Sequence, residues 1–139
     1  MYLKASEFYG LEEVPGSEHN QIILDWFADI GFKWVKDDET AWCSCFINWV
    51  ALKCGCERSF KLDARSWLKV GKEVLTPKLG HIVVLWREKK TGWKGHVGLF
   101  AGRNPNRDIY VLGGNQNNKV NIKLYRKNRL LGYRELETA

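Results

Sequence analysis

The sequence predicts a single α+β domain, in which N-terminal helices pack on a C-terminal antiparallel β-sheet. The chain has 139 residues, which suits one hydrophobic core, because two independent cores would need more chain to bury their surfaces. Before Gly71 the apolar residues recur at helical spacing, and after it they fall in short β-branched runs separated by Gly, Asn and Lys. Helices followed by strands are typical of α+β folds. We therefore assign residues 1–139 to one domain.

Three helices are expected after a short turn or helix over Lys4–Tyr9. The apolar residues of Glu18–Ile30 recur at spacings of three, four and seven, which predicts an amphipathic helix. Residues 42–54 are mostly apolar and a glycine follows them, so we expect a largely buried helix there. A third helix is expected over Asp63–Val70, with Asp63 as a possible cap.

Five strands are expected in the second half of the chain. Each is a short run of mainly apolar, often β-branched residues, and the polar connections over residues 88–92 and 103–108 are short enough for antiparallel hairpins. The predicted strands are His81–Arg87, His96–Gly102, Ile109–Gly113, Val120–Leu124 and Leu131–Glu135. The tryptophans at 26, 49 and 67 fall in apolar helical stripes and are predicted to belong to the core.

The charge of the chain favours a polyanionic partner. Lys and Arg number 22 against 16 Asp and Glu, so the formal net charge is +6 at pH 7. Nucleic acid, an acidic membrane and an anionic cell-wall polymer would all suit such a surface. No run approaches the roughly 18 uncharged apolar residues of a membrane helix, and no recognition helix, zinc finger or aromatic RNA-binding signature is evident. We therefore expect neither a membrane nor a nucleic-acid partner.

The cysteines at 43, 45, 54 and 56 are expected to be free thiols. The first residues lack the apolar run of a secretory signal, which predicts synthesis in the cytoplasm, where disulfides are rare. Four thiolates could also bind zinc. On one helix, however, Cys43 and Cys54 would lie about 16 Å apart, which one ion cannot bridge. We therefore predict no metal and no other cofactor.

Cys43 is the candidate nucleophile. It stands at the predicted start of a buried helix, where the first-turn amides and the helix dipole stabilise a thiolate. The same amides could bind the oxyanion that forms when sulfur attacks a carbonyl. Cys45 lies about 200° further round the helix and is expected to point elsewhere.

A thiol nucleophile needs a base, and His96 is the best placed of the three histidines. It begins a predicted strand between two glycines, which leave space for another element to approach closely. His81 opens the preceding strand and is the alternative. On the following strand, alternation places Asn115 on one face with Val111 and Gly113, where its side chain could orient the imidazole.

Three short segments together resemble the CHAP and NlpC-type cell-wall peptidases, which are papain-like hydrolases of peptidoglycan. The closest resemblance is to a small single-domain branch found in bacteria and bacteriophages, and it spans about Gly10 to Arg134. The segments are Trp42-Cys-Ser-Cys-Phe-Ile-Asn-Trp49, Gly95-His-Val-Gly98 and Leu112-Gly-Gly-Asn-Gln116.

The resemblance implies a papain-like fold with Cys43 as nucleophile, His96 as base and Asn115 as the orienting residue. Many CHAP enzymes hold a Glu two residues before the Asn, where this chain has Gly113. The third role therefore rests on Asn115 or on Gln116. In the same relatives the strand that holds His81 usually starts with Gly-Asp, so the histidine is a departure.

Other residues are expected to contact the substrate. Trp42, Trp93 and Gln116 are the candidates for the substrate cleft, because they stand beside the proposed catalytic residues in the sequence. An acidic wall polymer could be held by basic residues such as Lys94, Arg103, Arg107 and Lys119.

The leading hypothesis is therefore a peptidoglycan hydrolase that cleaves an amide bond through a thioester, as an endopeptidase or an N-acetylmuramoyl-L-alanine amidase. We expect a monomeric phage lysin or bacterial effector, made without a signal peptide, that acts at the bacterial cell wall. With nearly all of the chain used by the catalytic fold, the basic surface is expected to serve in targeting. The alternatives are a non-catalytic wall-binding or regulatory module on the same fold and, from the net charge, a nucleic-acid-binding domain.

Overall fold

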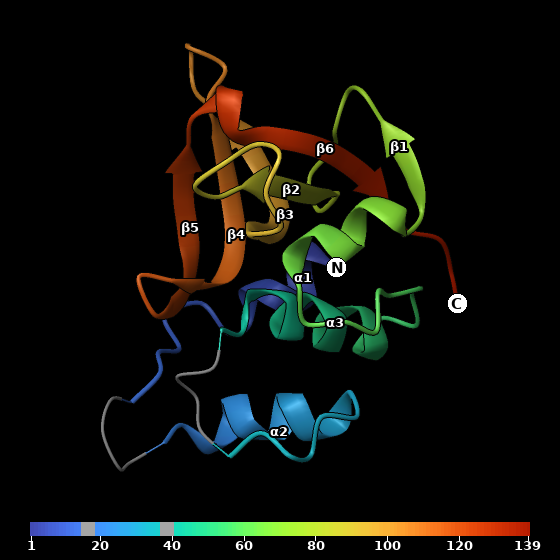
Figure 1. Cartoon of the computed structure of the whole chain (residues 1–139), viewed down its shortest axis with the longest axis vertical. Coiled ribbons are helices and arrows are strands. Elements are labelled where there is room, and N and C mark those ends of the chain that lie inside the picture. The colour runs from blue at the N-terminus through green and yellow to red at the C-terminus, as the bar shows by residue number, and fades with distance from the viewer. Residues whose placement is uncertain (15–18, 37–40) are drawn as a thin grey trace.

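The computed structural model describes residues 1–14, 19–36 and 41–139, and it confirms the predicted α+β architecture. Helices come first in the chain and strands follow (Figure 1). The helical elements are α1 (Tyr2–Ser6), α2 (Gln21–Asp29), α3 (Cys43–Lys53) and the 3₁₀-helices η1 (Ala64–Lys69) and η2 (Lys127–Arg129). The strands are β1 (Lys72–Val74), β2 (Ile82–Trp86), β3 (Gly95–Arg103), β4 (Ile109–Gln116), β5 (Lys119–Tyr125) and β6 (Leu130–Glu135).

The helix predicted over Glu18–Ile30 begins at Gln21, and Glu18 lies outside the described residues. Asn20 is its N-cap, because the side-chain oxygen of Asn20 accepts the backbone N–H of Ile22 at 2.9 Å. The third predicted helix forms as the 3₁₀-helix η1. Helix α3 matches the predicted buried helix closely.

The strands form one antiparallel sheet in the order β1-β6-β2-β3-β4-β5. The five predicted strands are all present. Strand β1 was not predicted, because its three residues are too few for an alternating pattern, and it forms by pairing with β6 at the sheet edge. Helix α3 packs against β3 and β4, and α2 lies on the far side of α3 (Figure 1).

The larger core lies between the helices and the sheet. The predicted core tryptophans are confirmed there, with Trp26, Trp49 and Trp67 exposing 2%, 7% and 0% of their surfaces. Phe8 joins α1 to this core through edge contacts with Trp26 and Trp49, whose ring centroids both lie 5.2 Å away. A smaller apolar cluster, centred on Leu85 and Phe100, covers the other face of the sheet.

Buried polar side chains of α3 hold the segment that follows it. Ser44 donates from its hydroxyl to the Lys61 carbonyl at 2.7 Å and accepts the Trp67 indole N–H at 3.0 Å. Asn48 accepts the Phe60 N–H at 3.1 Å and donates to the same Lys61 carbonyl at 3.1 Å. Both side chains are fully buried, so these bonds fix the segment before η1 against α3.

Arg65 of η1 holds the β2–β3 hairpin in turn. Its guanidinium donates to the carbonyls of Lys89, Lys90 and Lys94 at 2.7, 2.8 and 2.9 Å. One side chain thus fixes both sides of the hairpin loop to η1, and η1 is itself bonded to α3 through Trp67.

Strand β4 approaches the start of α3 at Gly114. A Cβ at this position would lie 2.6 Å from Cζ3 of Trp42 and 3.0 Å from Cβ of Phe46. Trp42 is the N-cap of α3, so the absence of a side chain at Gly114 lets the first turn of the helix sit directly beneath β4.

We predict that Gly114→Ala lowers the free energy of unfolding by about 1–3 kcal/mol, because the added methyl group overpacks the Trp42 ring. Urea denaturation of the wild type and the variant measures the change. Gly92→Ala is the matched control, since the nearest atom to a Cβ there is 3.4 Å away. Equal losses in both variants would contradict the close approach at Gly114.

Candidate active site

Cys43 is the first residue of α3, as predicted. The first intrahelical hydrogen bond runs from the Phe46 N–H to the Trp42 carbonyl at 2.9 Å. The backbone N–H groups of residues 43–45 therefore have no partner within the helix and carry its positive end. The Cys43 side chain is buried but lines a cavity of about 200 Å³. This is the geometry that a helix-start nucleophile needs.

Burial raises the pKa of the Cys43 thiol above its ordinary value, while hydrogen bonding to the backbone of Val97 and Ser44 and the charge of Arg87 act in the opposite direction. The thiol is therefore protonated in the resting protein. The contact with Val97 also locates the sulfur beside the start of β3, one residue from His96.

His96 is the second residue of β3 and lines the same cavity as Cys43. Burial lowers the pKa of the imidazole to about 4, helped by the charges of Arg87, Lys123 and Arg129, although the hydrogen bond to Gln116 acts against this. The ring is therefore neutral near pH 7. No hydrogen bond joins Cys43 to His96 among the described residues, so the resting pair is a neutral thiol beside a neutral imidazole.

Gln116 fixes the tautomer of His96. The Gln116 amide nitrogen donates to the Val111 carbonyl at 3.1 Å and to the carbonyl and side-chain oxygens of Asn121 at 2.8 and 2.9 Å. Its Oε1 must therefore be the atom 2.9 Å from His96 Nε2, and the imidazole donates this bond. The lone pair of the neutral ring then lies on Nδ1, which is left free to accept a proton.

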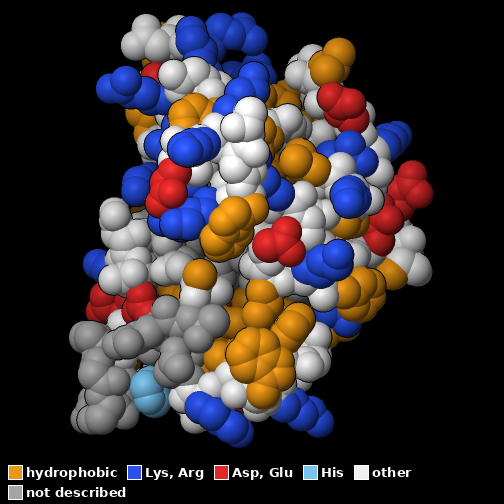
Figure 2. All heavy atoms as spheres, in the orientation of Figure 1, with side chains coloured by type: hydrophobic (Ala, Val, Ile, Leu, Met, Phe, Trp, Pro, Cys, Tyr) orange, Lys and Arg blue, Asp and Glu red, His pale blue; other side chains and the backbone are white. Residues whose placement is uncertain are grey.

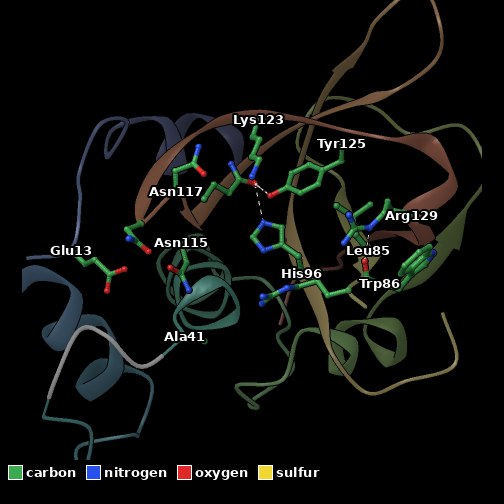
Figure 3. A pocket seen from close by; sticks show the side chains of 13 residues that line it. Glu13, Ala41, Leu85, Trp86, His96, Asn115, Asn117, Lys123, Tyr125 and Arg129 are labelled. Atoms are coloured by element: carbon green, nitrogen blue, oxygen red, sulfur yellow. Dashed lines mark hydrogen bonds between the residues drawn. The ribbon is translucent and has the colours of Figure 1, made fainter. Parts of the chain in front are cut away.

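Tyr125 supports the same pair. Its hydroxyl donates to Gln116 Oε1 at 3.2 Å, a bond drawn as a dashed line in Figure 3. Its ring stacks on the His96 imidazole with centroids 5.4 Å apart. Tyr125 therefore covers one face of the imidazole, and Gln116 bonds it at Nε2. Tyr125 was not among the residues singled out from the sequence, since nothing in its local pattern marks it.

Of the two residues predicted for the orienting role, Gln116 bonds the imidazole and Asn115 does not. The pairing of β4 with β5 shifts between Gly113 and Gln116, and Asn115 has a left-handed φ of 57°. The extra residue reverses the alternation, so Gln116 shares the face of Gly113 while Asn115 lines the cavity. A Cβ on Gly113 would lie 2.9 Å from Gln116 Oε1, so the Gln116 amide occupies the space that a side chain at 113 would fill.

A larger cavity of about 490 Å³ adjoins the one at Cys43 and shares Ala41, Arg87, His96 and Asn115 with it. Gln116 lines this larger cavity although its side chain is engaged by His96. The predicted site residues Cys43, His96, Asn115 and Gln116 therefore meet around one continuous hollow.

The two tryptophans predicted to line the cleft have different outcomes. Trp42 has no exposed surface, because its ring packs against Trp26 and beneath Gly114, so its assignment to the cleft is wrong. Trp93 is 73% exposed and lines the cavity at Cys43, where it is available to a substrate.

His81, the alternative base, and Cys45, the neighbouring thiol, lie outside the two cavities. His81 Nδ1 accepts the Lys78 N–H at 3.1 Å, and His81 lines a separate hollow with Met1 and Tyr2, at the opposite end of β2 from the strand partner of His96. Cys45 has no exposed surface, and burial raises its pKa. In the part of the chain that the structure describes, no group of three or more His, Cys, Asp and Glu is arranged to hold a metal ion.

The basic residues at the cavity differ from those predicted. Of Lys94, Arg103, Arg107 and Lys119, Lys94 alone lines a cavity at the site, where it pairs with Glu88 at 2.9 Å. Arg103 instead stacks on Phe100 and Tyr133, and Lys119 pairs with Glu12 at 3.8 Å. The cations of the larger cavity are Arg87, Lys123 and Arg129. They come from separate segments, so no sequence pattern marks them.

The family model of the CHAP domain matches residues 35–115, a segment that includes Cys43, His96 and Asn115 and stops one residue before Gln116. No curated protein matches the chain. No helix among the described residues is both long enough and apolar enough to span a membrane.

We predict that Gln116→Ala releases the tautomer of His96. Without the Oε1 acceptor, the ring loses its preference for a proton on Nε2, and the two nitrogen shifts in a long-range ¹H–¹⁵N spectrum move toward each other. Asn115→Ala is the matched control and should leave both shifts in place. Unchanged shifts in Gln116→Ala would contradict the assignment.

The lowered pKa of His96 predicts acid sensitivity. Between pH 6.5 and about 4 the unfolded chain binds a proton at this residue that the folded chain does not, so stability is complete above pH 6.5 and falls as the pH drops through this window. The loss attributable to His96 should reach about 3 kcal/mol at pH 4. Urea denaturation of the wild type and of His96→Gln from pH 4 to 7 tests this. Equal slopes for the two proteins would refute it.

Proposed function

The chain belongs to the CHAP domain family, and on this basis we propose that it cleaves an amide bond of bacterial peptidoglycan through a thioester on Cys43. CHAP domains act on peptidoglycan as amidases or peptidases. The observation that supports the specific chemistry is the meeting of a helix-start thiol and an oriented, neutral imidazole around one cavity.

The first step is attack of the sulfur on the amide carbonyl carbon. His96 Nδ1 takes the proton of the Cys43 thiol as the carbon–sulfur bond forms, because both groups are neutral in the resting protein. The carbonyl oxygen becomes an oxyanion. The N–H groups at the start of α3 that make no hydrogen bond within the helix are available to bind it, and each well-placed donor contributes about 3 kcal/mol to such a transition state.

Collapse of the tetrahedral species breaks the carbon–nitrogen bond. The leaving amine takes the proton from His96 Nδ1, and the acyl group stays on Cys43 as a thioester. Water then attacks the thioester, with His96 again accepting a proton and returning it to the departing thiolate. Gln116 and Tyr125 keep the imidazole edge pointed in one direction through both steps.

An endopeptidase and an N-acetylmuramoyl-L-alanine amidase would use this same chemistry on different bonds. We propose that the protein acts at the cell wall as a monomeric phage lysin or bacterial effector. Its Lys and Arg side chains support attachment to an anionic wall, and many of them lie over the sheet half of the face shown in Figure 2.

We predict that Cys43→Ala abolishes the release of soluble fragments from purified peptidoglycan, because the variant has no nucleophile. Mass spectrometry of the wild-type products identifies the bond: new amines within the peptide indicate an endopeptidase, and lactyl-ended glycans with free peptides indicate an amidase. Cys54→Ala is the matched control, since Cys54 is an exposed thiol outside both cavities.

Two outcomes would contradict the proposal. Undiminished release by Cys43→Ala would exclude this residue as the nucleophile. If the wild type binds wall fragments from several species but releases nothing from any of them, the protein is the non-catalytic wall-binding module instead.

A further inference from the structure

The larger cavity at the site has an uneven distribution of charge. Arg87, Lys123 and Arg129 line it, and Glu13 is the one carboxylate among its described lining residues. In Figure 3, Glu13 lies at one end of the hollow and Arg129 at the other, with His96 between them. Arg129 therefore lies at the end beyond His96, Lys123 lies beside His96, and Glu13 lies at the opposite end.

Two of the three cations are held in place by aromatic neighbours. Arg129 donates from Nε to the Trp86 carbonyl at 3.0 Å, and its guanidinium carbon lies 4.9 Å from the Trp86 ring centroid. Lys123 Nζ lies 5.4 Å from the Tyr125 ring centroid. Both side chains are half-buried. Their positions are set before any ligand binds, which lowers the entropy lost on binding.

Among the described residues, no carboxylate forms an ion pair with these cations. The ion pairs of the described residues involve Lys4, Lys72, Lys94 and Lys119 instead. Arg87 is exposed at the rim shared by the two cavities. Three like charges around one hollow repel one another, and each of them also disfavours protonation of His96. An anion bound here would offset both effects.

Resting on the proposed function, we propose that Arg87, Lys123 and Arg129 bind a free carboxylate of the peptide stem beside the scissile amide. Peptide stems contain acidic residues whose side carboxylates are either free or amidated. A carboxylate suits a guanidinium fork that is already oriented, because it accepts two parallel hydrogen bonds. The cavity then selects anionic stems over amidated ones.

The same placement orients the substrate. With the carboxylate at the Arg129 end, the adjoining amide lies over His96 and toward Cys43, since the two cavities meet at His96 and Asn115. The basic residues therefore do more than attract the wall polymer: they set which amide along the stem reaches the sulfur.

The test uses matched muropeptides that differ only in whether their side carboxylates are free or amidated. Wild-type protein should cleave the free form with a kcat/KM about tenfold higher, the size expected for a hydrogen-bonded charge contact. Lys123→Gln/Arg129→Gln should bring the ratio close to one by slowing cleavage of the free form. Arg126→Gln/Lys33→Gln removes the same two charge types at exposed positions outside the cavities and should keep the wild-type ratio.

Arg87→Gln provides a second variant if the double variant folds poorly, because the Arg87 side chain makes no hydrogen bond or ion pair among the described residues. Equal cleavage of the two forms by the wild type would overturn this inference and leave the proposed function standing. An unchanged preference in the cavity variants would overturn it as well. If the wild type cleaves neither muropeptide nor intact peptidoglycan, the proposed function itself fails.

Discussion

The hydrogen bond between Gln116 Oε1 and His96 Nε2 is the constraint on which the rest of the site depends. It places the free lone pair of the imidazole on Nδ1, and it exists because β4 contains one extra residue at Asn115 and no side chain at Gly113. Asn121 and Tyr125 then fix the amide that makes the bond. A glycine and a bulge in one strand therefore determine the direction in which a proton can move.

Burial of the two reacting groups has a chemical purpose of its own. Burial raises the pKa of the Cys43 thiol and lowers that of the His96 imidazole, so neither group is charged at rest. In the mechanism proposed above, charge develops only when a carbonyl is present to receive the sulfur. The backbone N–H groups at the start of α3 would then bind the oxyanion without reorganisation.

Periodicity and residue type are local signals, and they were sufficient for the fold class and for α3. The meeting of Cys43 and His96 at one cavity was predicted from the resemblance to the CHAP family. Local signals were insufficient where tertiary packing decides. Gln116 and not Asn115 bonds the imidazole because the pairing of β4 with β5 shifts register. Trp42 is buried because β4 approaches it closely at Gly114. Likewise, Arg87, Lys123 and Arg129 meet only once the sheet has formed.

The contacts of Arg65, Ser44 and Asn48 bear on how the protein could acquire new specificities. They brace the β2–β3 hairpin and the segment before η1 to the helix that presents the sulfur. Arg65 recognises three carbonyls of the hairpin, not its side chains. Exposed side chains of the loop such as Arg87 and Trp93 can therefore be substituted without loss of the Arg65 contacts that hold its backbone. Substitutions of these surface side chains can therefore change the substrate selectivity without any change to the backbone around Cys43.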